Sequence, residues 1–189
     1  VGTMKEPTTN TIGRDASNTY GTNGKIQDVR VYDRPLGPDE IAINYEMSRP
    51  DYLDIGTNNL VASLPLNNTD ITDIGPYNLA ATSTNITAVG EGLDDSACVF
   101  DGSTNWIDYS NIIPKLAGYS FSVSCFVYVS DNSNQRAFWV INNGVTVDNV
   151  VGLGINANGY LNLGWTTEQT TVHSNRLLNR WTHLTFIYN

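Results

Sequence analysis

Residues 24–45, which read GKIQDVRVYDRPLGPDEIAINY, decide the fold that we predict for this chain. Alternation in the first part places Val29 and Val31 on one face of a strand, because successive side chains of a strand point to opposite sides. Residues 33–35, Asp-Arg-Pro, then supply turn chemistry. We therefore expect a strand over residues 25–32 that ends in a tight turn.

One short helix is expected directly after this turn, over Pro38–Glu46. Proline suits the first helical position, where a backbone N–H has no intrahelical acceptor. Asp39 and Glu40 follow it, and their charges complement the positive N-terminal end of the helix dipole. No other stretch of the sequence gives an equally clear helix signal.

The strand, turn and helix together resemble the closing segment of laminin-G-like domains, which belong to the concanavalin-A-like jelly-roll superfamily. In that family the pattern G-x-I-x-D-V-R-I/V-Y-x-R-x-L-S/T-x-x-E-I ends the domain. Other stretches resemble the earlier strands of such a domain, in the family's own order. They are LVASLPLN (60–67), TDIG (72–75), ACVFDG (97–102), WIDY (106–109), FSVSCFVYV (121–129) and WTHLTFI (181–187). The resemblance implies an all-β, two-sheet antiparallel sandwich with one short helix.

The closing pattern precedes the opening patterns, so the domain order looks rotated. We assign residues 1–46 to a closing segment, 47–59 to a joint, and 60–189 to the opening and central strands. Each motif occurs once, so no internal repeat is visible. Three explanations stay open: one circularly permuted sandwich, a window across two tandem domains, or a segment swapped between copies.

Composition fits one large sandwich and argues against some partners. The chain has 189 residues, of which 40% are hydrophobic and 15% charged, and its formal net charge is −9. Nucleic-acid binding normally requires clustered Lys and Arg, and the sequence has no such cluster. No apolar run approaches ~18 residues, so we expect no membrane insertion.

Short alternating runs bounded by Gly, Asn, Asp and Pro predict the remaining strands, as in an antiparallel sandwich. The predicted strands are residues 25–32, 60–66, 97–100, 106–109, 121–129, 137–141, 151–155, 160–165 and 181–188, with a weak one at 11–13. Residues 142–144 and 156–159 are predicted hairpin turns, because Asn and Gly tolerate a positive φ. Cys98 and Cys125 lie inside predicted strands, and we interpret them as buried thiols, with a disulfide as the alternative.

Catalysis is not indicated by the sequence. Glycosidases of this fold carry two carboxylates in an E-x-D-x-x-E strand, and that pattern is absent. The acidic and histidine residues considered are Asp94, Asp95, Glu40, Glu46, His173 and His183. They suggest neither a paired acid and base nor a Ser-His-Asp order. We therefore predict that the protein is not an enzyme, and keep a glycoside hydrolase only as a remote alternative.

A metal site is a second candidate. Two histidines and two cysteines within strands make no zinc pattern. Calcium fits better, because related jelly rolls often hold Ca²⁺ at the rim through Asp side chains and carbonyl oxygens. The matching positions are Asp73 in TDIG and Asp101 in FDG. The competing interpretation is that both carboxylates stabilise turns through backbone hydrogen bonds. We thus expect either no cofactor or Ca²⁺.

Aromatic residues are the third candidate, because their faces stack on sugar rings. Phe126 and Tyr128 point away from the face of Cys125, so we expect them to line a sheet surface. Trp139 and Trp165 are expected to join them as ligand-binding residues, although strand aromatics most often serve as core.

The resemblance implies a non-catalytic recognition or adhesion module that binds a glycan or a protein. Its expected setting is a larger extracellular, cell-surface or virion protein, because the Asn/Thr/Gly-rich, Lys-poor and Cys-poor composition suits bacterial surfaces and phage particles. The alternative is a structural or decorating module of a phage or virus particle, held by neighbouring subunits and binding no sugar.

Overall fold

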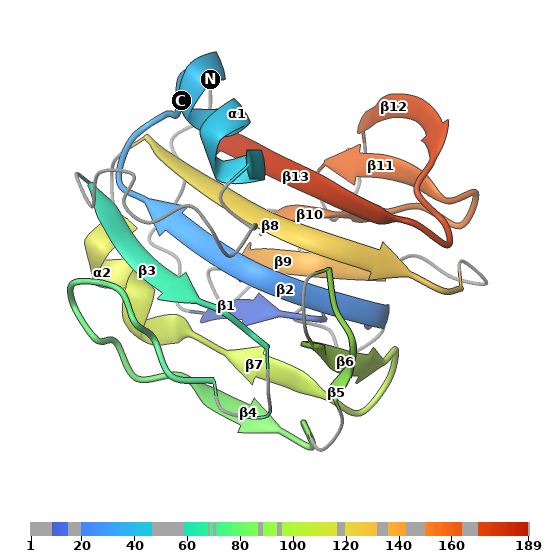
Figure 1. Cartoon of the computed structure of the whole chain (residues 1–189), viewed down its shortest axis with the longest axis horizontal. Helices are drawn as coiled ribbons and strands as arrows, with labels where there is room; N and C mark the ends of the chain where they lie inside the picture. Colours follow the sequence, from blue (N-terminus) through green and yellow to red (C-terminus); the bar gives the residue numbers. More distant parts are fainter. Residues whose placement is uncertain are drawn as a thin grey trace.

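The structure is a computed structural model of the chain. It describes residues 9–14, 20–46, 59–67, 69, 71–86, 89–93, 96–116, 120–131, 136–142, 150–163 and 170–188. Two antiparallel sheets pack face to face, and one short helix, α1 (Pro38–Glu46), lies on the outer side of one of them (Figure 1). The predicted all-β sandwich with a helix at 38–46 is therefore confirmed.

The first sheet has seven strands in the order β12-β11-β10-β9-β1-β7-β4. Their bounds are β12 (Thr170–Arg176), β11 (Tyr160–Leu163), β10 (Val150–Ile155), β9 (Arg136–Asn142), β1 (Thr9–Ile12), β7 (Trp106–Asp108) and β4 (Thr82–Thr84). β1 pairs with β9 on one side and β7 on the other, so this early strand lies inside the sheet and not at its edge.

The second sheet has six strands. Five follow the order β13-β8-β2-β6-β5, and the sixth, β3, pairs with β2. Their bounds are β13 (Trp181–Tyr188), β8 (Phe121–Val129), β2 (Asn23–Tyr32), β6 (Ser96–Asp101), β5 (Val89–Glu91) and β3 (Leu60–Leu64). β2 is thus central, with β8 along one side and with β6 and β3 along the other.

A bulge in β2 sets which residues face the core. The pairing of β2 with β8 shifts between Gln27 and Arg30, and Asp28 has a φ of 53°. This extra residue keeps both Ile26 and Val29 buried in the core, as a bulge places two residues opposite one. Val31 follows on the same inner face, as the alternation predicts.

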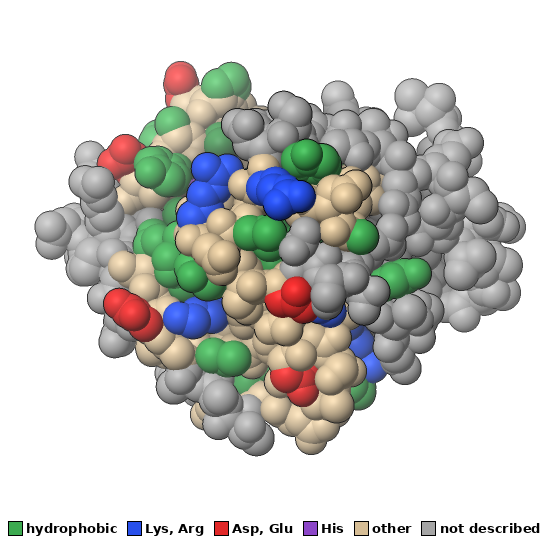
Figure 2. All heavy atoms as spheres, turned by 90° about the vertical axis from the view of Figure 1, so that its right-hand side faces the viewer, with side chains coloured by type: hydrophobic (Ala, Val, Ile, Leu, Met, Phe, Trp, Pro, Cys, Tyr) green, Lys and Arg blue, Asp and Glu red, His purple; other side chains and the backbone are tan. Residues whose placement is uncertain are grey.

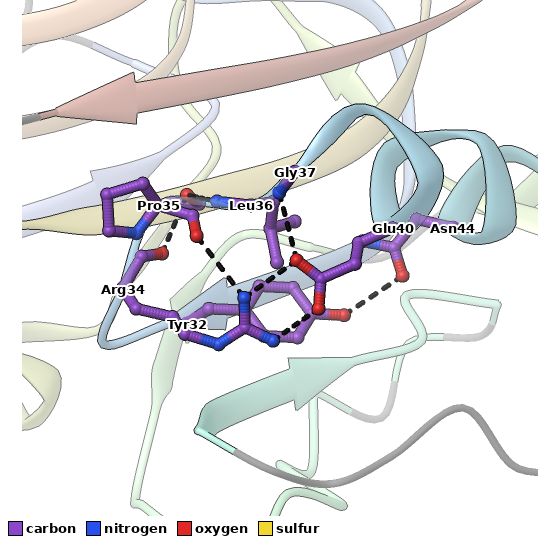
Figure 3. Close-up of polar contacts among 8 residues, drawn as sticks. Tyr32, Arg34, Pro35, Leu36, Gly37, Glu40 and Asn44 are labelled. Carbon is purple, nitrogen blue, oxygen red and sulfur yellow. Dashed lines mark hydrogen bonds and ion pairs between the residues drawn. The ribbon is translucent and has the colours of Figure 1, made fainter.

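Helix α1 is fixed to the sheet by polar contacts at its start (Figure 3). Glu40 accepts hydrogen bonds from the Arg34 guanidinium and from Gly37 N at 2.9 Å. The Ser122 hydroxyl accepts from Leu36 N at 2.9 Å and donates to the Arg34 carbonyl at 2.8 Å. These bonds hold α1 over one end of β8 and β2.

One continuous hydrophobic core fills the space between the sheets. β8 contributes its inner face completely, as the alternation predicts. The core residues of β8 are Phe121, Val123, Cys125, Val127 and Val129. Its outer face carries Ser122, Ser124, Phe126 and Tyr128. Strand alternation therefore assigns both faces of this strand correctly.

Some elements were not predicted. β4, β5 and β12 are additional strands, and a 3-10 turn η1 (Ser110–Ile112) leads into a one-turn helix α2 (Ile113–Leu116). β1 and β3 also differ slightly from the predicted 11–13 and 60–66. Asn142, the first residue of the predicted turn at 142–144, is the last residue of β9. The rest of that turn, the joint at 47–59 apart from Asn59, and the end of the strand at 160–165 lie outside the described residues.

The predicted turn at 156–159 is confirmed as the connection between β10 and β11. Asn156 Oδ1 accepts hydrogen bonds from Asn158 N at 2.9 Å and Tyr160 N at 3.2 Å, and Gly159 has a φ of 81°. None of the helices in the described ranges has the length and apolar character needed to cross a bilayer.

Candidate functional site

The outer face of the six-stranded sheet is divided in two by α1. In Figure 1, α1 lies at the top of the picture, beside the left-hand ends of β13 and β8. The other end of the same face carries Lys25 of β2, Tyr128 of β8 and Trp181 of β13, which lie in one row because the registers pair Lys25 with Tyr128 and Tyr128 with Trp181.

These three residues form what we call the aromatic platform. The ring centroids of Tyr128 and Trp181 are 5.8 Å apart with planes inclined at 58°. Lys25 Nζ lies 5.4 Å from the Tyr128 centroid and donates a hydrogen bond to the Glu91 carbonyl at 2.7 Å. All three platform residues are partly exposed. Figure 2 views this end of the molecule, where hydrophobic and basic side chains adjoin and acidic ones are scattered.

Phe126, the predicted partner of Tyr128, has a different environment. It points to the outer face as expected, but only 2% of its surface is exposed. The ring of Tyr45 of α1 stacks on the Phe126 ring with 6.2 Å between the centroids, and the centroid of the His183 ring lies 4.6 Å from that of Phe126. Phe126 therefore anchors the helix on the sheet and does not offer a free ring to a ligand.

Ser124 and His183 lie next to each other beneath α1. Ser124 Oγ and His183 Nε2 are 2.8 Å apart, which is the spacing of a nucleophile and its base. However, Ser124 is 2% exposed, and the rings of Phe126 and Tyr45 lie against His183. Burial, and then the charge of Arg30, lower the pKa of His183 to about 4. This pair is a neutral hydrogen bond that holds β8 and β13 together on the covered face.

Trp139 lies in the core, not on a ligand-facing surface. It is 1% exposed, and its ring is 5.8 Å from that of Phe121 and 6.1 Å from that of Phe186. The pairing of β9 with β10 shifts beside Phe138, so Phe138 and Trp139 both face inward. From this position the ring is not accessible to a sugar. Trp165 lies outside the described residues.

The buried carboxylate of Asp73 accepts hydrogen bonds from backbone N–H groups. Its Oδ1 accepts from Ser63 N and Gly75 N, and its Oδ2 accepts from Leu79 N, each at 2.8 Å. The turn is tight: a Cβ on Gly75 would lie 2.8 Å from Asp73 Oδ1 and 2.9 Å from Ala62 Cα. Asp73 is 3% exposed and borders a hollow of about 370 Å³ between residues 71–73 and 78–81.

Asp101 builds a similar but exposed turn. Its Oδ1 accepts from Ser103 N and Thr104 N at 2.8 Å, and its Oδ2 accepts from the Thr104 hydroxyl. Burial acts to raise the pKa of Asp101, but these hydrogen bonds lower it below its usual value. Within the described residues, no three His, Cys, Asp or Glu side chains gather as a metal site would require. The hydrogen bonds at both aspartates fit the turn interpretation.

The two cysteines and the other acidic candidates do not belong to the aromatic platform. Cys98 and Cys125 are buried free thiols, as interpreted from the sequence, and burial raises their pKa values to about 11 and about 12. Glu40 is bound by Arg34, and Asp94 and Asp95 lie outside the described residues.

Sequence reasoning missed Trp181 and Lys25 as members of the site. Alternation places Trp181 on the face opposite Leu184, but the sequence does not reveal that β13 aligns it with Tyr128. The available signal was that alternation places both Tyr128 and Trp181 on the outer faces of two long strands.

No family model, curated protein or solved structure matches this chain.

Proposed function

We propose that this protein is a non-catalytic recognition module that binds a glycan through the aromatic platform. The proposal places it among laminin-G-like jelly rolls, inside a larger extracellular, cell-surface or virion protein. The observation that carries it is the row of Lys25, Tyr128 and Trp181 at the end of the sheet that α1 leaves uncovered.

The chemistry of this row suits a sugar. Two adjoining aromatic rings offer apolar faces to the C–H groups of a pyranose, while polar groups at the edge fix its orientation. Lys25 supplies such a group, because an ammonium has three donors and the Glu91 carbonyl takes one of them. The platform is also built on three paired strands, which keep its geometry rigid.

The test is glycan binding by the 189-residue chain, first on an array and then by calorimetry with the best glycan. We expect Tyr128→Ala and Trp181→Ala each to weaken binding about two- to thirteenfold, from ~0.5–1.5 kcal/mol per stacked ring. Tyr77→Ala is the matched control, because Tyr77 also pairs with a lysine, Lys115 at 4.4 Å, and is 51% exposed.

Weaker binding by both platform variants, with the affinity of Tyr77→Ala unchanged and all melting temperatures similar, supports the proposal. Two results contradict it: no binding to any glycan on the array, or equal affinity of the wild type and both platform variants.

A structural or decorating module of a virus particle is the second candidate. It is favoured by one observation, the long uncharged edge strand β13, which suits contact between neighbouring subunits. An empty glycan array together with self-association would select this candidate over the first.

A further inference from the structure

The edges of the two sheets differ in how they are protected. Natural proteins guard sheet edges with short strands, charges, Pro or bulges, because an open edge pairs readily with another strand. β4 and β5 have three residues each. β12 carries Arg176, and its pairing with β11 has a register shift. β3 is covered, because Ser63 N donates to Asp73 and the Ser63 carbonyl accepts from Ile74 N.

Within the described residues, β13 shows none of these protections. It is eight residues long, reads WTHLTFIY and contains no Asp, Glu, Lys, Arg or Pro. It pairs with β8 at all eight positions without a register shift, and in the part of the chain that the structure describes it pairs with no other strand. Such a long, regular and uncharged edge is a surface for strand addition.

The surroundings of this edge are apolar. Ile187 is 39% exposed, although it lies in the strand. Tyr45 of α1 is 55% exposed and lies 5.9 Å from His183, so the helix extends the apolar surface beside the strand. Any strand added here would therefore gain side-chain contacts as well as backbone hydrogen bonds.

We propose that β13 pairs antiparallel with β13 of a second copy of this chain, about a two-fold axis. An antiparallel edge is self-complementary, and one such edge on each chain closes the assembly at two. A register centred on Thr185 places Leu184 of each copy opposite Phe186 of the other. No like charges face one another across this contact, which would otherwise oppose self-pairing.

The contact is small, so the dimer is a reversible one. One strand pair with a helix flank belongs to the low end of interface sizes, below about 1,200 Å². Each chain also has a formal net charge of −9, and the repulsion between two such bodies is screened by salt. Dimerisation should therefore strengthen with both protein concentration and ionic strength.

Sedimentation of the full chain over roughly a hundredfold range of concentration tests this, at low and at high salt. We expect the average mass to rise toward twice that of the monomer. Ile187→Lys should remain monomeric, because it places a charge at the edge. Ile74→Lys is the matched control: it makes the same charge change at a residue that is 68% exposed and lies outside β13.

Both variants reduce the net negative charge, so general electrostatics would favour association in each. Loss of the dimer in Ile187→Lys alone therefore reports on the edge itself. A wild type that stays monomeric throughout overturns the proposal, and so does an Ile187→Lys variant that dimerises like the wild type.

Hydrogen exchange of the wild-type chain provides a test without any substitution. Amides of residues 181–188 that point away from β8 should exchange more slowly at high protein concentration than at low concentration. Amides of β4 serve as the internal reference. Dimerisation with unchanged exchange in 181–188 contradicts pairing through β13.

Discussion

Replacing Asp73 by alanine should destabilise the protein strongly, although this residue is far from the aromatic platform in the sequence. The substitution leaves three backbone N–H groups, those of Ser63, Gly75 and Leu79, without their acceptor. A hydrogen bond to a charged group contributes ~1.5–3 kcal/mol, and a buried donor left unpaired costs about 1–3 kcal/mol.

The magnitude follows from the burial of these three donors. Ser63 is buried, so its unpaired N–H carries a cost of about 2 kcal/mol. Gly75 and Leu79 are half-buried, so water can replace the carboxylate at a cost of about 1 kcal/mol for each N–H. The sum is about 4 kcal/mol, a large part of the ~5–15 kcal/mol that a domain possesses. For a chain of this length, that corresponds to a fall of roughly 8–16 °C in melting temperature.

Asp101→Ala is the matched control. Asp101 accepts the same kind of backbone hydrogen bonds, but it is exposed, so water replaces the carboxylate at a cost of about 1 kcal/mol, or roughly 2–4 °C. Thermal unfolding followed by circular dichroism measures both variants. Asp73→Asn should fall between them, since it keeps one carboxamide oxygen as acceptor.

The same unfolding experiment in EDTA separates the turn from a calcium site. The turn predicts equal melting temperatures for the wild type with and without EDTA. An EDTA-induced fall as large as that of Asp73→Ala would show that the carboxylate acts through a cation. A fall in Asp73→Ala no larger than in Asp101→Ala would refute the hydrogen-bond reasoning.

Three further predictions concern the core and the covered face. Trp139→Ala should cost ~3–5 kcal/mol in denaturant unfolding, because it empties a fully buried site; a loss below about 1 kcal/mol would remove Trp139 from the core. Cys98 and Cys125 should react with a thiol reagent only after unfolding, since burial raises both pKa values; rapid labelling of the native protein would disagree. Burial and the charge of Arg30 lower the pKa of His183 to about 4 from the usual 6.5. As the pH falls, His183 therefore becomes protonated in the unfolded chain before it does so in the folded protein. The stability due to neutral His183 is complete above about pH 6.5 and decreases toward pH 4, and His183→Gln should flatten the melting temperature over this window; identical pH profiles would speak against it.

Long strands with regular alternation could be predicted closely, because their burial pattern is written in the sequence. The prediction for residues 121–129 matches β8 at both ends, and its inner face is the one expected. β4 and β5 escaped prediction because each has only three residues. Thr82 and Ser83 of β4 and Glu91 of β5 are also exposed, so they show no buried face. Such strands form through their partners and not through a hydrophobic pattern of their own.

The candidate site was predictable only in part. Alternation correctly placed Phe126 and Tyr128 on the outer face, but it could not show that α1 covers one ring and leaves the other open. Trp139 was misplaced because a bulge beside Phe138 turns two consecutive residues inward, and a bulge arises from pairing with a neighbour.

The sequence by itself determined the layered all-β class, the helix at Pro38–Glu46 and the faces of the long strands. These are local properties, set by a period of two and by capping and turn residues. Only the tertiary structure decided that β2 lies at the centre of a sheet, that Tyr128 meets Trp181 and that β13 is an edge. Those features depend on register and strand order, which join residues far apart in the chain and leave no local trace in it.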